Sequence, residues 1–227
     1  MTPFQRARSD EQRLVRRQNI LRTAAEMLAE MPVSALSLNE LSRRVGLAKS
    51  NVLRYFESRE AVLLDLLEES AREFLDEVGE PLRAQVDPSA TLDARTVAVA
   101  SGAAAAFAAR PMLCELLSAQ AGVLEHNISV DVATRYKQGA RDSLLGFAAL
   151  LRHLFPELDR PRSEQGANLV IVMIGGLWTH CHPAPAVRAV YDADPSFAFM
   201  DTKFEDALRG SLCVLLAGLV TGPAPLT

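Results

Sequence analysis

The sequence predicts an all-α fold, and three observations support this prediction. Ala and Leu are abundant while aromatic residues make up only 6% of the chain, a composition that favours helix over sheet. Apolar residues recur with helical spacing along most of the chain. The twelve prolines are spread along the sequence and separate the periodic segments. A chain of 227 residues has room for one large domain or two small ones.

The first helical segment covers residues 11–30, where apolar side chains fall on one face and Pro32 ends the pattern. Further along, Ser37-Leu38-Asn39-Glu40 forms a capping box. In this motif Ser37 caps the amide at N3, and Glu40 reaches back to the amide of Ser37. Gly46 then supplies the left-handed residue that stops the short second helix.

A third short helix is predicted from Ala48 to Tyr55. A fourth begins after Ser58 and ends near Gly79 and Pro81. Residues 37–56 therefore consist of a helix, a tight glycine turn and a helix. This spacing is that of a helix-turn-helix, whose second helix inserts into the major groove of DNA. An ordinary helical hairpin has the same pattern and stays open as the alternative.

Charge is distributed unevenly along the chain, although the net charge is only −4. Residues 1–60 contain eleven Lys and Arg against seven Asp and Glu, whereas the remainder contains thirteen against twenty-one. A basic end on an acidic body indicates either a surface that meets a polyanion or a solubilising tail.

The rest of the chain divides at its prolines into further predicted helices, over residues 91–109, 112–124, 129–154, 163–181 and 201–219. Residues 169–178 are apolar all round, which predicts a helix buried on every side. Residues 182–200 are predicted to form a loop. A loop of that length is often functional or mobile.

The stretch from Arg17 to Leu67 resembles the DNA-binding domain of the TetR family of bacterial regulators. Three motifs carry the resemblance: Ile20-Leu21-x-x-Ala24-Ala25-x-x-Leu28, then Ser37-Leu38-x-x-Leu41-x-x-x-Val45-Gly46-Leu47-Ala48-Lys49-Ser50, then Leu53-Arg54-Tyr55-Phe56-x-Ser58-Arg59-Glu60-x-Val62-Leu63. The resemblance implies an N-terminal three-helix DNA-binding domain (residues 1–60, with 1–13 a flexible basic arm). It also implies a C-terminal helical ligand-binding and dimerisation domain (residues 61–227).

Three positions depart from the family pattern. Ala48 stands where a Ser commonly caps the recognition helix, and Leu53 stands where a Tyr commonly reaches a phosphate. These two changes remove a cap and a phosphate contact, while Arg59 keeps the charge of the usual Lys.

Helical spacing assigns the faces of the third helix. Val52 and Phe56 are four residues apart and are expected to face inward. The expected DNA-binding residues of this helix are Lys49, Ser50, Asn51, Leu53, Arg54 and Tyr55. The resemblance adds Ser37 and Arg59 as phosphate contacts, because they lie at helix starts that face the DNA backbone in such folds. Lys and Arg suit guanine or phosphate, and Asn suits adenine. Leu53 either touches a thymine methyl or packs on a neighbouring helix, and Tyr55 either bonds a phosphate or packs.

The C-terminal domain is expected to hold a small apolar or aromatic effector. The candidate lining residues are Phe107, Met112, Leu116, Phe147, Leu151, Met173, Leu177 and Trp178, for which ordinary core packing is the alternative. The resemblance implies that the helices 163–181 and 201–219 pair across a two-fold axis in a homodimer that reads an inverted-repeat operator in double-stranded DNA. Plain core packing within the chain is the alternative.

No catalytic motif stands out in the sequence, so we expect neither an enzyme nor a cofactor. His180-Cys181-His182 does not predict a metal site, because adjacent helical residues point in different directions. The three cysteines are an odd number without a CxxC pair, which predicts reduced thiols in the cytoplasm. The longest apolar runs are shorter than the roughly 18 residues that span a bilayer, and we expect no membrane contact.

The resemblance implies a transcription regulator, in most cases a repressor that a small apolar effector releases from DNA. A DNA-binding regulator without an effector is the first alternative. A helical enzyme with a fortuitous helix-turn-helix is the second.

Overall fold

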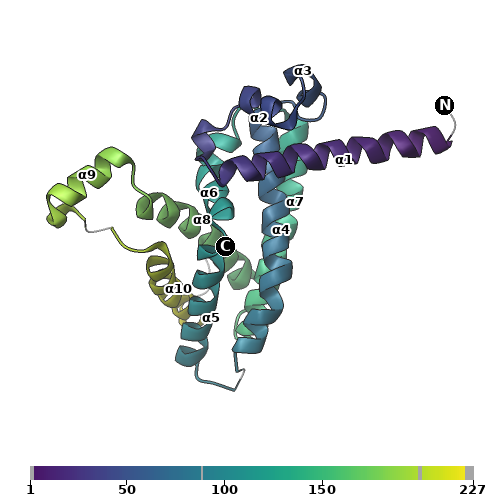
Figure 1. The fold of residues 1–227 in the computed structure, drawn as a ribbon. Coiled ribbons are helices and arrows are strands. Elements are labelled where there is room, and N and C mark those ends of the chain that lie inside the picture. Colours follow the sequence, from purple (N-terminus) through teal and green to yellow (C-terminus); the bar gives the residue numbers. More distant parts are fainter. Residues whose placement is uncertain (1–2, 88, 199–200, 223–227) are drawn as a thin grey trace. The chain divides into compact units, whose positions relative to one another are not determined.

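The computed structural model describes residues 3–87, 89–198 and 201–222, without the side chains of residues 3–10. Contacts group the chain into two units, an N-terminal unit (Met1–Glu69 with Ala119–Lys137) and a C-terminal unit (Ser70–Ser118 with Gln138–Thr227). The α-helices are α1 (Pro3–Leu28), α2 (Leu38–Val45), α3 (Lys49–Val52), α4 (Arg59–Gln85), α5 (Leu92–Ala108), α6 (Pro111–Ala119), α7 (Val130–Leu154), α8 (Arg160–Cys181), α9 (Pro185–Ala193) and α10 (Phe204–Thr221) (Figure 1). The described residues contain no strand, which confirms the all-α prediction.

The core of the N-terminal unit forms where α1 packs on α2 and α2 packs on α3. One stripe of α1 is fully buried, and it consists of Ile20, Ala24 and Met27. The other fully buried side chains of this core include Leu36, Leu41, Val52, Val62, Leu63 and Leu64. The apolar periodicity of the sequence therefore marks the buried face correctly.

Helix α1 is longer than the sequence pattern indicated. It begins at Pro3 and ends at Leu28, whereas the prediction placed a flexible arm over residues 1–13. Residues 1–2 lie outside the described residues, and the rest of that arm is helical. The physical reason is local, because Pro3 suits the first turn of a helix and the polar residues after it are mostly good helix formers.

The turn between α2 and α3 has the predicted geometry. Ser37 caps α2, its hydroxyl accepting a hydrogen bond of 3.2 Å from the amide of Glu40. Gly46 ends α2 with φ +74°, a left-handed conformation that favours glycine. The second half of the predicted capping box is wrong, since the Glu40 carboxylate accepts from Arg43 and Arg44 instead.

Helix α4 also differs from its prediction, because it continues through Pro81 to Gln85. A proline removes one backbone hydrogen bond, but here it lies in the last turns of the helix. Val78, Leu82 and Val86 follow one another at four-residue spacing and are all buried. Burial of this stripe offsets the lost bond and carries the helix past the proline.

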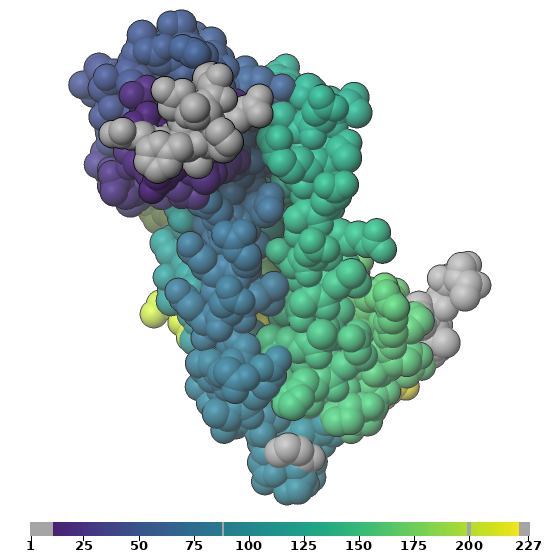
Figure 2. Space-filling view, turned by 90° about the vertical axis from the view of Figure 1, so that its right-hand side faces the viewer, coloured from purple at the N-terminus to yellow at the C-terminus, as the bar shows by residue number. Residues whose placement is uncertain are grey.

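The C-terminal unit is held together by α10, which packs on α5 and α8. The second half of α4 and α7 lie side by side in this unit (Figures 1 and 2), where a Cβ on Gly146 would lie 3.4 Å from Leu75. Helix α8 passes close to α6, since a Cβ on Gly175 would lie 3.1 Å from the carbonyl oxygen of Leu117. Gly175 therefore serves packing within the chain.

The predicted loop at residues 182–200 contains helical structure. Helix α9 occupies Pro185–Ala193, and a short 3-10 turn follows at Pro195–Phe197. The sequence signals were Pro185, which suits the first turn, and the helical spacing of Val187, Val190 and Tyr191. In the ribbon α9 stands away from α8 and α10 (Figure 1), and none of its residues is buried.

Helix α8 is apolar, but within the single chain it is not buried on every side, although the sequence predicted that it would be. Val172 is 72% exposed and Leu169 is 43% exposed. By length and composition, no single helix among the described residues could cross a membrane. One pair, Leu92–Ala108 and Pro111–Leu124, passes that test jointly and is bent by 88°.

Candidate nucleic-acid interface and ligand pocket

The faces of α3 are those that helical spacing predicted. Val52 is fully buried and Phe56 is 3% exposed, so both anchor the helix to the core. The regular helix is only four residues long, Lys49–Val52. Beyond it, the amide of Tyr55 still donates to the carbonyl of Val52 at 2.9 Å, which keeps the next residues in a helical turn.

The polar side chains predicted to read DNA share one exposed surface. This reading surface consists of Lys49, Ser50, Asn51 and Arg54, all exposed. Leu53 is 42% exposed, and Tyr55 is half-buried at the edge of the surface. Helix α3 begins at Ala48 without a side-chain cap, as expected from the alanine at this position.

The basic residues of the N-terminal unit fall into two groups. Arg43 donates to Glu40 at 2.9 and 2.6 Å, and Arg44 donates to Glu40 and Glu30. Hydrogen bonds from Arg43 and then Arg44 lower the pKa of Glu40 to about 2. Within the described part of the chain, Lys49 and Arg54 form no ion pair with a carboxylate. The charge on the reading surface is thus not neutralised within the protein.

Two of the predicted phosphate contacts are already engaged in the fold. Arg59 donates from Nη1 to the carbonyl of Leu36 at 3.2 Å and from Nε to Glu60 at 3.1 Å. The Ser37 hydroxyl accepts the cap bond of α2. It keeps its own proton for a donated bond, since a hydroxyl has one donor as well as its acceptor lone pairs.

A cleft that the sequence did not reveal lies beside the reading surface. Its volume is about 370 Å³, and its lining residues are Gln12, Arg13, Arg16, Arg54 and Tyr55. The available signal was the run of arginines before Ile20, which indicated only charge because their facing partner lies some forty residues further along the chain.

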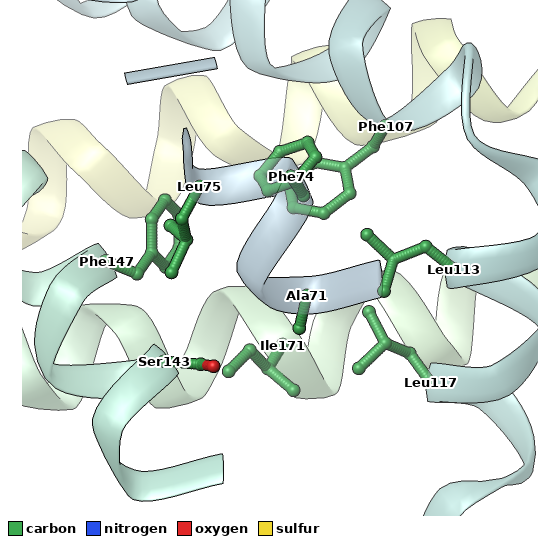
Figure 3. A pocket seen from close by; sticks show the side chains of 9 residues that line it. All are labelled: Ala71, Phe74, Leu75, Phe107, Leu113, Leu117, Ser143, Phe147 and Ile171. Atoms are coloured by element: carbon green, nitrogen blue, oxygen red, sulfur yellow. The ribbon is translucent and has the colours of Figure 1, made fainter. Parts of the chain in front are cut away.

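The C-terminal unit contains an apolar pocket of about 60 Å³ between α4, α5, α6, α7 and α8 (Figure 3). Its lining residues are Ala71, Phe74, Leu75, Phe107, Leu113, Leu117, Ser143, Phe147 and Ile171. The rings of Phe74 and Phe107 stack with centroids 4.1 Å apart. Ser143 brings a hydroxyl to a lining that is otherwise apolar (Figure 3).

Of the eight residues predicted to line a pocket, this one includes Phe107 and Phe147. The other six do not line it: Met112, Leu116, Leu151, Met173, Leu177 and Trp178. Leu116 and Leu151 are buried core residues. Trp178 donates from Nε1 to Glu115 at 2.8 Å and stacks on His182. Helical spacing identified apolar faces, but it did not tell which of them enclose empty space.

The outer faces of α8 and α10 expose apolar side chains. Val214 is 77% exposed and Val172 is 72% exposed. A groove of about 300 Å³ lies between the two helices, and its lining includes Leu169, Val214 and Gly218. Leu216, in contrast, is buried within the chain at 1% exposure.

The His180-Cys181-His182 segment is engaged in local packing. His182 Nδ1 lies 2.8 Å from the carbonyl of Trp178, and Cys181 Sγ lies 4.0 Å from the hydroxyl of Thr202. Among the described residues, no group of three or more His, Cys, Asp or Glu could hold a metal ion.

Comparison with known proteins agrees with this architecture. A profile described as "Bacterial regulatory proteins, tetR family" matches residues 20–66. A second, described as "Tetracyclin repressor-like, C-terminal domain", matches residues 68–223. No curated protein matches the sequence.

Solved structures share the fold at low sequence identity. A TetR transcriptional regulator from Rhodococcus sp. RHA1 has a TM-score of 0.59 and 15% identity, covering 95% of this chain and 100% of its own. The fatty acid degradation regulator FadR from Bacillus halodurans has a TM-score of 0.54 and 14% identity, covering 89% and 95%. The second profile covers more than half of the chain, and the two profiles together show that the chain belongs to the TetR family of bacterial transcription regulators.

Proposed function

We propose that this regulator reads an inverted-repeat operator through the reading surface of α3, with residues 1–60 acting as its DNA-binding domain. The observation that carries the proposal is the exposure of Lys49, Asn51 and Arg54 on one segment. Buried Val52 and Phe56 anchor that segment to the core. Lys can bond guanine O6 and N7, Asn can bond adenine N6 and N7, and Arg can bond either guanine or a backbone phosphate. Ser50 belongs to the same surface, and Leu53 and Tyr55 lie beside it.

The remaining predicted contacts then position the domain on the backbone. Ser37 and Arg59 lie at the starts of α2 and α4, and helix starts attract anions. Because Arg59 is already bonded to Leu36 and Glu60, we expect its contribution to DNA affinity to be smaller than that of Arg54.

Selection of bound sequences from random duplex DNA with the full chain tests this proposal. We expect a logo of two half-sites related by a two-fold axis and centred about one DNA turn, roughly 34–36 Å, apart. A protein that enriches no sequence, or a logo without half-sites, would refute the proposed mode of reading.

We propose further that residues 61–227 form the dimerisation and effector domain. The exposed Val172 and Val214 on α8 and α10 are the contacts we assign to a second copy of the chain. An isologous dimer buries the same patch on both copies and thereby presents two reading surfaces. Light scattering supplies the mass, and a monomer at micromolar concentration would contradict the assignment.

The effector that fits the apolar pocket is a small apolar or aromatic compound, and its binding would release the repressor from DNA. Ligand sites usually have volumes of about 300–1,000 Å³, whereas this pocket measures about 60 Å³. Binding therefore requires the lining side chains to move apart. Such a rearrangement is a means by which a ligand can change the DNA-binding conformation.

A thermal-shift screen with apolar compounds tests the effector proposal. FadR from Bacillus halodurans, described as a regulator of fatty acid degradation, shares the fold, and we therefore include fatty acids in the panel beside aromatic compounds. We expect a stabilising compound to lower operator affinity. If no compound in the panel does both, regulation without an effector becomes the better account.

A further inference from the structure

The cleft beside the reading surface joins two parts of the sequence that lie far apart. Gln12, Arg13 and Arg16 come from α1, while Arg54 and Tyr55 follow α3 directly. All five belong to the N-terminal unit, in which α1 extends well beyond α2 and α3 (Figure 1). The cleft thus brings three guanidinium groups around one solvent-filled space of about 370 Å³.

Helix geometry explains why α1 presents arginines to this cleft. The buried stripe of α1 contains Ile20 and Ala24, and residues three or four apart share a face. Continuing that face towards the N-terminus leads from Ile20 to Arg16 and Arg17, and from Arg17 to Arg13. The face that is apolar in the core therefore becomes cationic where it passes the end of α3.

Arg17 fixes the position of this cationic face. It forms an ion pair with Asp65, whose side chain is 7% exposed, and its guanidinium lies 5.1 Å from the ring centroid of Phe56. The neighbouring Gln18 donates to Glu69 at 3.0 Å. These contacts anchor α1 directly beside Arg16 and one turn from Arg13. The α1 side of the cleft therefore belongs to a helix that is held in place.

The charge in the cleft is not balanced by its own lining. No carboxylate is among the lining residues that the structure describes, whereas Arg43, Arg44 and Arg59 each bond a glutamate. Three convergent positive charges repel one another, and a bound anion removes that repulsion. Guanidinium groups bind phosphate oxygens in bidentate fashion, and a tyrosine hydroxyl can add a further bond.

We propose that this cleft binds one phosphodiester group of the operator backbone, with Arg13 and Arg16 of α1 and Arg54 and Tyr55 closing around it. The proposal rests on the proposed DNA-reading function. The backbone is the source of the phosphate because Arg54 and Tyr55 directly follow the exposed residues of α3, where the duplex must approach. The phosphate contact that Leu53 cannot supply is thereby made from α1.

Salt dependence of operator binding tests the proposal through R13Q, R16Q and the double variant. Each arginine is exposed, so all three proteins are expected to fold, which circular dichroism verifies. We expect each single change to weaken operator and random DNA equally, by about tenfold at low salt. The slope of log K against log salt should become shallower by about 1.8 in the double variant, which is about 0.9 for the one phosphate that each protomer of the proposed dimer contacts.

The matched control is R22Q, which removes one charge from the same helix. Arg22 is exposed and lies two residues from Ile20, away from the buried stripe. Its affinity and salt slope should equal those of the wild type. An equal loss in R22Q and R16Q would overturn the cleft assignment, because net charge alone would then explain the result.

Neutral methylphosphonates placed singly along the operator locate the phosphate. One position in each half-site should weaken the wild type and have no effect on the double variant. If the loss of affinity from a methylphosphonate adds to the loss from the double substitution at every position, the proposal is overturned. The proposal is also overturned if inorganic phosphate stabilises the wild type only, while no methylphosphonate position loses its effect in the double variant. If the wild type selects no sequence at all, the DNA-reading function itself fails. If operator binding is intact but the salt slopes of the variants are unchanged, only the phosphate cleft fails.

Discussion

The two units of the chain differ in how their candidate sites are built from the sequence. In the N-terminal unit the reading surface comes from one continuous stretch, and a cap at Ser37, a left-handed Gly46 and two buried anchors define it. In the C-terminal unit the pocket draws residues from five helices spread from Ala71 to Ile171. Local signals therefore define the first site, whereas long-range packing defines the second.

The largest effect we expect separates buried from exposed positions within the C-terminal unit. Leu216→Asp places a charge at a position with 1% exposure, where an unpaired buried charge costs several kcal/mol. It should unfold the protein. Val172→Asp changes a residue that is 72% exposed and should leave the helical content intact while splitting the dimer. Circular dichroism and light scattering distinguish the two, and a folded Leu216→Asp dimer would contradict the assigned core.

Truncation of the pocket wall should be the next largest effect. Phe107 is 5% exposed and stacks on Phe74, and removal of a buried phenylalanine costs about 3–5 kcal/mol. For a chain of this size we expect Phe107→Ala to lower Tm by roughly 10 °C. Operator affinity measured well below that Tm should not change. A large loss of affinity at low temperature would show that the pocket wall and the reading surface are not separable.

A smaller effect is expected from Gly46, the glycine in the turn between α2 and α3. Gly46 has φ +74°, and a Cβ added there would meet no atom within 4 Å, so that only backbone strain opposes a side chain. Gly46→Ala should cost about 1–2 kcal/mol in urea unfolding. The control is Gly79→Ala within α4, where a Cβ would meet only Arg83 at 3.9 Å. That change should be neutral or stabilise by up to about 1 kcal/mol, and equal losses would argue against the left-handed turn.

The smallest effect concerns pH. Hydrogen bonds from Arg43 and Arg44 hold the pKa of Glu40 at about 2, below its ordinary value of 4.5. A depressed folded pKa contributes stability above pH 4.5, and this contribution is lost as the pH falls from 4.5 towards 2. Glu40→Gln should therefore lower stability slightly at pH 7 and make its decline in this acid range shallower. Identical pH profiles for the two proteins would show that these exposed ion pairs add nothing.

What the sequence could predict follows the same division. The sequence predicted three local features correctly: the inward side chains of Val52 and Phe56, the cap at Ser37 and the turn at Gly46. Each of them depends on neighbours within four residues. Glu40 was assigned to the wrong partner, since two arginines one turn further on compete for its carboxylate. Sequence spacing shows which partners a side chain can reach, but not which of them it bonds.

The pocket and the cleft were less predictable for a different reason. Phe107 and Phe147 were identified, but Phe74 and Ile171 were not, because an apolar helical face has the same pattern whether it meets a side chain or a void. The cleft between α1 and the end of α3 needs the packing angle of two helices, which no local pattern contains. Continuation of α4 through Pro81 depends likewise on burial of Leu82 and Val86.

The reading surface is the central claim, and operator affinity of four proteins tests it most directly. Wild type, Lys49→Ala, Arg54→Ala and the control Arg22→Ala are titrated against the selected operator and against single-base variants of it. We expect Lys49→Ala to lose about 1–3 kcal/mol of binding free energy with relaxed preference at the base that it contacts. Arg54→Ala should lose a similar amount equally on the operator and on its base variants, because Arg54 contacts a phosphate, while Arg22→Ala matches the wild type. Losses in Lys49→Ala and Arg54→Ala no larger than in the control, with base preference unchanged, would contradict the account.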